Sequence, residues 1–136
     1  MVSASNSNVP EPSGPRILVV EDMALVANEI ERQLRMAGYR VVGPFDSVDT
    51  ALAALGKPET VVDAALLDIN LAGMPCYPVA DVLIERQIPM CFLTGYLRDY
   101  LPDDYSDLPF LEKPFSRDDL RNMLRQLLHP AQHHSG

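Results

Sequence analysis

The sequence predicts an α/β fold, a doubly wound parallel sheet of five strands with helices on both faces. Short aliphatic runs alternate with longer segments of helical periodicity, and this order calls for parallel strands joined by right-handed crossovers. Several of the runs also end at polar residues of different chemical kinds. At 136 residues the chain fits one compact domain.

The expected elements alternate along the chain. The runs are β-branched and continuously apolar, which is typical of strands buried on both faces. Strands are expected over residues 16–20, 39–42, 61–67, 88–93 and 108–112. Helices are expected over residues 23–36, 48–55, 79–86 and 117–128.

Residues at the helix ends support these assignments. Asp22 is expected to cap the first helix, and Gly38 lies where a C-terminal glycine belongs. Ser47 is expected to cap the second helix, and Pro78 suits the first turn of the third. Ser116 begins a Ser-x-x-acid capping box that opens the last helix.

One segment interrupts the alternation. Residues 96–107 (YLRDYLPDDYSD) show no clear apolar helical face. A fourth helix after the fourth strand is expected here, but Pro102 limits it to one or two turns. We therefore predict a mobile loop with a short or irregular helix.

Composition sets the limits of the domain. Residues 1–15 are rich in Ser, Asn, Pro and Gly, and they predict a disordered N-terminal arm without the features of a secretory signal. Residues 129–136 predict a flexible tail, so the folded domain is expected over residues 16–128. Cys76 and Cys91 are expected to be free thiols rather than a disulfide.

Charge and hydropathy argue against two classes of partner. Nineteen acidic and eleven basic residues give a formal net charge of −8, which disfavours binding to nucleic acid. No apolar stretch approaches the roughly 20 residues that span a bilayer. We expect a cytoplasmic protein that binds neither nucleic acid nor membrane.

The polar strand endings are the main functional signal. The carboxyl ends of parallel strands meet at one edge, where ligands bind in sheets of this kind. The endings supply three carboxylates, a hydroxyl and an ammonium: Glu21, Asp22, Asp68, Thr94 and Lys113. Clustered carboxylates need a cation, and Mg²⁺ prefers oxygen ligands together with phosphate oxygens.

The same inventory suggests roles around a phosphoryl group. Asp68 can act as a nucleophile that forms an aspartyl-phosphate. Thr94 can donate a hydrogen bond to a phosphoryl oxygen, and Lys113 supplies a compact positive charge. Each residue also has an ordinary structural explanation, such as a helix cap, a turn or a surface connection.

Four motifs together resemble the receiver domain of bacterial two-component response regulators, over about residues 16–128. They are VVEDMALVA (19–27), LLDINLAG (66–73), FLTGY (92–96) and LEKPF (111–115). The resemblance implies a flavodoxin-like strand order, 2-1-3-4-5. It also implies a cis Lys113-Pro114 bond.

The resemblance assigns a role to each site residue. It implies a phosphoacceptor at Asp68 and Mg²⁺ ligands at Glu21, Asp22, Asp68 and the backbone carbonyl of Asn70. It implies a phosphate-sensing hydroxyl at Thr94 and a phosphate-pairing ammonium at Lys113. Thr94 and Phe110 would form the conformational switch, although packing in the core explains Phe110 equally well.

The function that follows is that of a stand-alone, single-domain response regulator. A sensor histidine kinase or a histidine phosphotransfer protein would phosphorylate Asp68. The output would be phosphorylation-dependent protein binding or drainage of phosphate from a shared kinase. The chain would then be a signalling protein and not an enzyme acting on separate substrates.

Three alternatives remain open. A receiver fold that is never phosphorylated could serve only as a protein-binding platform. A flavodoxin-like electron carrier would need a phosphate-binding loop where this chain has carboxylates. A metal-dependent phosphohydrolase would need a second acid where this chain has Asn70.

Overall fold

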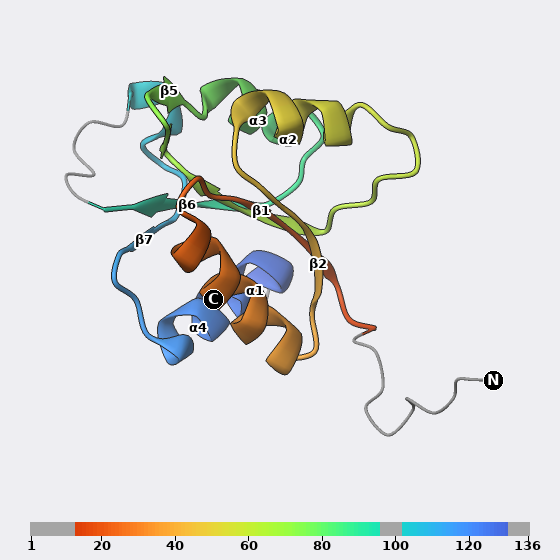
Figure 1. The fold of residues 1–136 in the computed structure, drawn as a ribbon, viewed down its shortest axis with the longest axis vertical. Helices are drawn as coiled ribbons and strands as arrows, with labels where there is room; N and C mark the ends of the chain where they lie inside the picture. The colour runs from red at the N-terminus through yellow and green to blue at the C-terminus, as the bar shows by residue number, and fades with distance from the viewer. Residues whose placement is uncertain (1–12, 96–101, 131–136) are drawn as a thin grey trace.

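A five-stranded parallel sheet forms the centre of the structure, a computed structural model that describes residues 13–95 and 102–130 (Figure 1). The strands are β1 (Arg16–Val20), β2 (Arg40–Phe45), β3 (Ala64–Asp68), β6 (Met90–Thr94) and β7 (Phe110–Glu112). They lie side by side in the order β2-β1-β3-β6-β7. The predicted doubly wound sheet and its strand order are confirmed.

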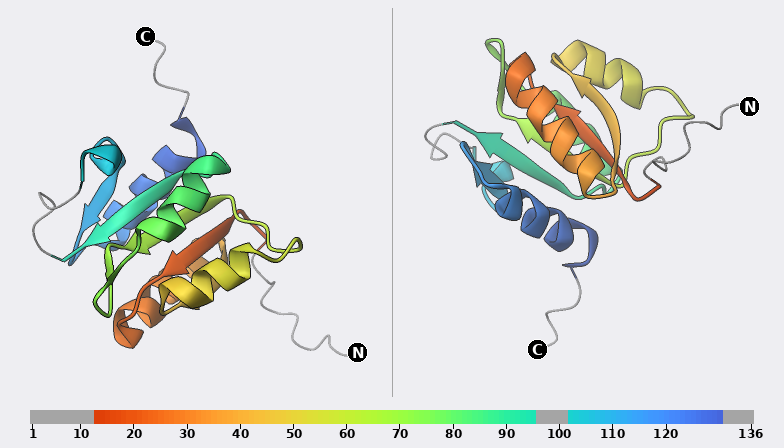
Figure 2. Two further views of the ribbon diagram at one scale, coloured as in Figure 1. Left: turned by 90° about the horizontal axis from the view of Figure 1, so that it is seen from above. Right: turned by 60° about the horizontal axis from the view of Figure 1, so that its bottom comes forward.

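Two helices cover each face of the sheet. The four are α1 (Ala24–Met36), α2 (Val48–Leu55), α3 (Tyr77–Glu85) and α4 (Arg117–Leu128). Figure 1 shows α2 and α3 on one side, and α1 and α4 on the other. The further views in Figure 2 show the same two layers from above and below.

Alternation along the central strands produces two cores. Leu18 and Val20 of β1 pack with α2 and α3, whereas Ile17 and Val19 pack with α1 and α4. Successive side chains of a strand point to opposite faces, so a continuous apolar run fills both layers. All four of these side chains have no exposed surface.

The second strand extends beyond its predicted end at Val42. It continues through a cis Gly43-Pro44 bond to Phe45, which pairs with Val20 after a register shift. Gly43 has φ +105°, a conformation that favours glycine. Because β2 is an edge strand, it tolerates a proline that has no amide to donate to a neighbour.

The other element boundaries differ from prediction by only a few residues. The strands β3, β6 and β7 begin two or three residues later than expected, and α3 begins two residues earlier. Pro78 lies in the first turn of α3, as its sequence position indicated. The Ser47 cap and the Ser116–Asp119 capping box are both present.

Asp22 does not cap α1, contrary to the prediction from the sequence. The N-cap residue is Met23, which makes no side-chain capping bond. Asp22 turns instead toward the loop after β3, where its Oδ2 accepts a hydrogen bond from the Ala72 amide at 2.9 Å. A tertiary contact has replaced the local one.

The loop after β3 contains a small antiparallel hairpin that the sequence did not predict. It comprises β4 (Asn70–Leu71) and β5 (Met74–Pro75). Its two turn residues, Ala72 and Gly73, have φ of 54° and 89°. Positive φ at both positions is typical of the tight turns that join hairpin strands.

The segment after β6 agrees with the predicted short fourth helix in the part that is described. A single 3₁₀ turn, η3 (Asp103–Tyr105), precedes β7. Residues 96–101 of the predicted loop lie outside the described residues. Most of the expected arm and tail also lies outside them, but Gly14 and Pro15 form backbone hydrogen bonds with Gly38 and Arg40.

The cysteines, the Lys113-Pro114 bond and the described helices can also be compared with the predictions. Cys76 and Cys91 are free thiols, as predicted, and both are buried. The Lys113-Pro114 bond is cis, as the family resemblance implied. Among the helices that the structure describes, none combines the length and apolar character needed to cross a membrane.

Candidate functional site

The polar strand endings meet at one edge of the sheet, as the sequence predicted. Glu21 follows β1, Asp68 ends β3, Thr94 ends β6 and Lys113 follows β7. The strand pairing brings them together, because Val20 lies opposite Leu67 and Thr94 lies opposite Glu112. The Lys113 amide also donates to the Thr94 carbonyl at 2.8 Å.

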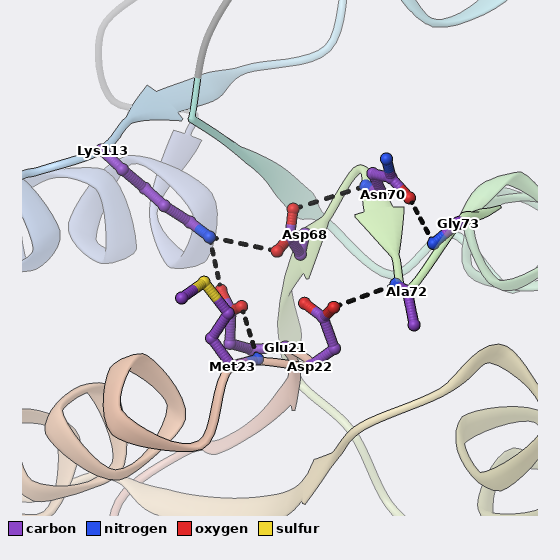
Figure 3. A network of polar contacts seen from close by, with 8 residues as sticks. All are labelled: Glu21, Asp22, Met23, Asp68, Asn70, Ala72, Gly73 and Lys113. Atoms are coloured by element: carbon purple, nitrogen blue, oxygen red, sulfur yellow. Dashed lines mark hydrogen bonds and ion pairs between the residues drawn. The ribbon is translucent and has the colours of Figure 1, made fainter.

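Three carboxylates form the centre of the site (Figure 3). Glu21, Asp22 and Asp68 each offer an oxygen, and these oxygens lie within 4.8 Å of one another. Glu21 and Asp68 are buried, and Asp22 is half-buried. The strands hold the first and last of these side chains in place, since each lies at or directly after a fully buried run.

Lys113 joins two of the carboxylates. Its Nζ lies 2.7 Å from Glu21 Oε1 and 3.0 Å from Asp68 Oδ2. Its side chain is only 18% exposed, so water screens these ion pairs less than it would on an open surface. Lys113 therefore balances one of the three negative charges at the centre.

The pKa of Glu21 shows the effect of burying a carboxylate at this site. The pKa of Glu21 is raised to about 7, chiefly by burial and further by neighbouring Asp68, against the lowering effects of Lys113 and the Met23 amide. For Lys113, burial opposes the charged form, but the two carboxylates outweigh it and raise the pKa of the ammonium. The site thus has an excess of negative charge that one lysine does not neutralise.

This donor set fits a hard divalent cation. Mg²⁺ binds carboxylate and carbonyl oxygens and is typically held by one or two carboxylates with several waters. When all three carboxylates are ionised, Glu21, Asp22, Asp68 and Lys113 together carry a net charge of −2, which matches the charge of such an ion. The residues present therefore fit Mg²⁺.

Backbone amides orient the carboxylates, and sequence reasoning missed these contacts. The Met23 amide donates to Glu21 Oε2 at 3.1 Å, and the Ala72 amide donates to Asp22 Oδ2 at 2.9 Å. Asp68 Oδ1 accepts a longer bond of 3.4 Å from the Asn70 amide. Gly73 was the available signal in the sequence, because a glycine in this loop indicates a tight turn.

Asn70 uses its side chain to stabilise the hairpin. Its Oδ1 accepts a hydrogen bond from the Gly73 amide at 2.9 Å, as Figure 3 shows. The side chain is thus held by the turn. Metal coordination by the Asn70 backbone carbonyl remains a prediction.

The two residues of the expected switch lie on adjacent strands. Thr94 is buried at the end of β6, with 4% of its surface exposed. Phe110 begins β7, pairs with Phe92 and packs against the core on the α2–α3 side. The packing role of Phe110 is present in the structure, and the switching role remains a prediction.

A groove of about 460 Å³ lies beside the site, between α1 and the loop after β7. Its walls combine apolar side chains with the edge of the charged centre. They include Leu25, Val26, Ile30, Lys113, Pro114 and Phe115. Leu25 is 84% exposed, so an accessible apolar side chain lines this groove together with Lys113.

Comparison with known proteins gives a consistent set of relatives. Residues 17–125 match the family model described as the response regulator receiver domain. The chain is 32% identical over 123 residues to the transcriptional regulatory protein PrrA of Mycobacterium leprae, covering 85% of this chain and 51% of PrrA. It is 31% identical over 111 residues to PdtaR of Mycobacterium tuberculosis, covering 77% and 52%. The chain spans about half the length of these curated relatives.

Solved structures extend the likeness to the fold. SdrG from Sphingomonas melonis Fr1 is 39% identical, with a TM-score of 0.74 and coverage of 84% of this chain and 96% of that chain. The receiver domain of the sensor histidine kinase PA1611 from Pseudomonas aeruginosa PAO1 is 27% identical, with a TM-score of 0.71 and coverage of 85% and 98%. That structure has a magnesium ion coordinated in its active site cleft.

Proposed function

Because the chain belongs to the response regulator receiver domain family, we propose that it accepts a phosphoryl group on Asp68 and thereby changes a binding surface. One observation carries the proposal. The Asp68 carboxylate lies at the end of β3, 3.0 Å from the Lys113 ammonium and among the oxygens of Glu21 and Asp22. A nucleophilic carboxylate, a fixed cation and a metal-type donor set are the groups that this transfer requires.

The transfer exchanges one bond for another. An Asp68 carboxylate oxygen forms a bond to phosphorus while the phosphorus–nitrogen bond of a donor phosphohistidine breaks. The electron pair of the broken bond stays on the imidazole nitrogen, and the phosphoryl group ends on Asp68. Lys113 would pair with the oxygens of the transferred group, and Thr94 would donate its hydroxyl hydrogen to one of them.

Glu21, Asp22, Asp68 and the Asn70 carbonyl would hold Mg²⁺ at this site. When bound, the ion would supply positive charge that offsets the carboxylates and the incoming phosphoryl oxygens. The related PA1611 receiver, with magnesium in its cleft, supports this part of the proposal. The protein would act only on its own phosphorylation and dephosphorylation, not on separate substrates.

Incubation with a small phosphodonor and Mg²⁺, followed by mass spectrometry, tests the proposal. The wild-type protein should gain the mass of one phosphoryl group, and peptide mapping should place it on Asp68. Asp68→Asn and removal of Mg²⁺ should each abolish the gain. Asp63→Asn is the matched control, since Asp63 immediately precedes β3 and lies at the other end of that strand.

A wild-type protein that gains no mass would contradict the proposal and favour the alternative of a protein-binding platform that is never phosphorylated. An equal gain in Asp68→Asn would also contradict it. In that case the phosphoryl group would reside on another side chain.

We propose that the donor is a sensor histidine kinase or a histidine phosphotransfer protein. The apolar groove beside Lys113 supports a protein donor, because a partner seated against Leu25 and Phe115 would lie next to the charged centre. We place the reaction in the cytoplasm, where such donors act. Phosphotransfer from each sensor kinase of the host to this chain would identify the donor.

We propose that the output is protein binding by a single-domain regulator, or drainage of phosphate from a shared kinase. The net charge of −8 supports a protein target over nucleic acid, and the 96% coverage of SdrG supports a single-domain form. We further propose that residues 16–128 form the receiver domain. Gly14 and Pro15, at the end of the expected arm, are joined to it by backbone hydrogen bonds.

A second candidate is the regulatory half of a transcription factor. The curated relatives carry names of transcriptional regulators, and the chain spans about half of their length. Immunodetection in the host separates the two forms. A species near the 15.1 kDa of this chain supports a single-domain regulator, and one of about twice that size supports the second candidate.

A further inference from the structure

Tyr105 anchors the segment before β7 onto helix α3. Its ring stacks on Tyr77, with ring centres 4.6 Å apart and planes at 9°. It also meets the edge of Phe92, with centres 6.1 Å apart and planes at 87°. Its hydroxyl donates a hydrogen bond of 2.6 Å to Asp81 Oδ1. We call these four residues (Tyr77, Asp81, Phe92 and Tyr105) the Tyr105 clasp.

The contacts of the clasp differ from ordinary surface contacts. A hydroxyl donating to a carboxylate forms a short, charge-assisted bond, stronger than a bond between neutral groups. Stacked and edge-on aromatic pairs add stabilisation beyond the apolar area that they bury. The Asp81 carboxylate also raises the pKa of Tyr105 to about 12, so the hydroxyl keeps its proton at any physiological pH.

One side of the clasp leads to Asp68. Tyr77 is the first residue of α3, and the preceding Cys76 donates its amide to the Ile69 carbonyl at 2.9 Å. Ile69 directly follows Asp68, so this bond closes the loop that carries the hairpin. The Cys76 thiol is fully buried, and burial together with the Asp68 charge raises its pKa to about 12. The start of α3 is therefore tied by a backbone hydrogen bond to the residue that directly follows Asp68.

The other side of the clasp leads to Thr94. Phe92 lies two residues before Thr94 on β6 and pairs across the sheet with Phe110. Tyr105 contacts Phe92 and belongs to the segment that leads into β7. The clasp thus connects the loop after Asp68 with the strand that ends at Thr94.

We infer that Tyr105 is a positioning residue for the chemistry at Asp68, an inference that rests on the proposed function. Its clasp holds the start of α3 against β6, and so fixes the loop after Asp68 relative to the strand that ends at Thr94. Tyr105 touches neither the phosphoryl group nor the metal site. It acts through the two loops that carry them.

The rate of phosphorylation by a small phosphodonor tests this inference. Tyr105→Leu, which loses both the stack and the hydrogen bond, should lower the rate severalfold, because small displacements of reacting groups reduce the rate strongly. Tyr105→Phe keeps the stack and should rescue much of the rate. Asp81→Ala should match Tyr105→Phe, because each change removes the hydrogen bond between the two side chains. The double variant should show little further loss, since that bond is already absent in either single variant.

Tyr39→Leu is the matched control for general destabilisation. Tyr39 packs on the opposite face of the sheet, against the core that α1 and α4 cover. Thermal unfolding of each variant separates stability from rate, and we expect Tyr39→Leu to lower the unfolding temperature without lowering the rate in the still-folded protein. Tyr105→Leu should lower both.

Two results would overturn the inference. One is a wild-type rate in folded Tyr105→Leu, and the other is an equal loss of rate in Tyr39→Leu. Failure of the proposed function is distinguishable from both, because the wild-type protein itself would then gain no phosphoryl group.

Discussion

Lys113 determines the electrostatic balance of the site. Its ammonium lies within 3.0 Å of two carboxylates from different strands, Glu21 and Asp68. Two ionised carboxylates that lie this close in a buried site repel each other strongly unless a cation lies between them. In the absence of metal, one side chain therefore stabilises the carboxyl edge of three strands.

Replacing Lys113 with methionine should destabilise the metal-free protein. Methionine keeps most of the apolar stem but leaves two buried carboxylates without their ammonium, at a cost of about 3 kcal/mol. Urea denaturation at pH 8 in the presence of EDTA measures the change. Adding Asp68→Asn should restore part of the stability because it removes one of the two charges.

Lys57→Met is the control for this prediction, since Lys57 is exposed near the end of α2 and should contribute little. Equal unfolding free energies for the wild type and Lys113→Met would show that the ion pairs do not stabilise the fold.

At the scale of elements, the β4–β5 hairpin connects the end of β3 to the Asp22 carboxylate. The turn at Ala72 and Gly73 presents the Ala72 amide to Asp22, and Asn70 supports the turn through the Gly73 amide. The orientation of Asp22 therefore depends on the backbone conformation of a neighbouring element. Local propensity near Asp22 does not determine it.

Gly73→Ala should weaken both the hairpin and the metal site. Gly73 has φ +89°, and a side chain in left-handed conformations costs about 1–2 kcal/mol. Thermal unfolding should show this loss, and calorimetric titration should show weaker Mg²⁺ binding because the Ala72 amide no longer holds Asp22 in place.

Gly56→Ala provides the matched comparison. Gly56 ends α2 with φ −76°, a conformation that alanine adopts readily, and a Cβ there would meet only ordinary contacts. Its replacement should leave Mg²⁺ binding unchanged and stability equal or slightly higher. If Gly56→Ala and Gly73→Ala lowered stability and Mg²⁺ binding equally, the turn at Ala72 and Gly73 would have no specific role in orienting Asp22.

For the whole molecule, burial of the Glu21 carboxylate makes the free energy of unfolding depend on pH. Burial raises the pKa of Glu21 from its ordinary 4.5 to about 7. Between these values the folded state binds more protons than the unfolded state, so the free energy of unfolding falls as pH rises. Above about pH 7 the buried charge persists, and the metal-free protein stays less stable than at acidic pH.

Stability as a function of pH should therefore depend on Glu21. In EDTA, the difference in unfolding free energy between Glu21→Gln and the wild type should grow from pH 4.5 to 7 in favour of the variant, by on the order of 1–3 kcal/mol. Saturating Mg²⁺ should reverse the difference, since only the wild type keeps the full set of carboxylates. Denaturation series at each pH measure both effects.

The exposed Glu59→Gln serves as the control and should track the wild type at every pH. A difference between Glu21→Gln and the wild type that does not change with pH would contradict the assignment of the raised pKa to Glu21.

The features that could be predicted from the sequence are those that depend on local residue patterns. Continuous apolar runs such as residues 64–67 indicate strands buried on both faces, and the polar residue that follows each run marks the carboxyl end. The strand order followed from the family motifs, and Ser47 and Ser116 identified their own helices through local capping. These signals depend on a few neighbouring residues, so they survive without knowledge of the fold.

The sequence by itself determined the alternation of strands and helices, the identity of the five polar endings and their meeting at one edge. Only the tertiary structure decided which groups hold those endings in place. In the folded chain, Asp22 accepts a hydrogen bond from the Ala72 amide and Lys113 pairs with two carboxylates. Tyr105 stacks on Tyr77 of α3. The physical reason is range: propensity and periodicity act over a few residues, whereas these contacts join residues that are 24 to 50 or more positions apart.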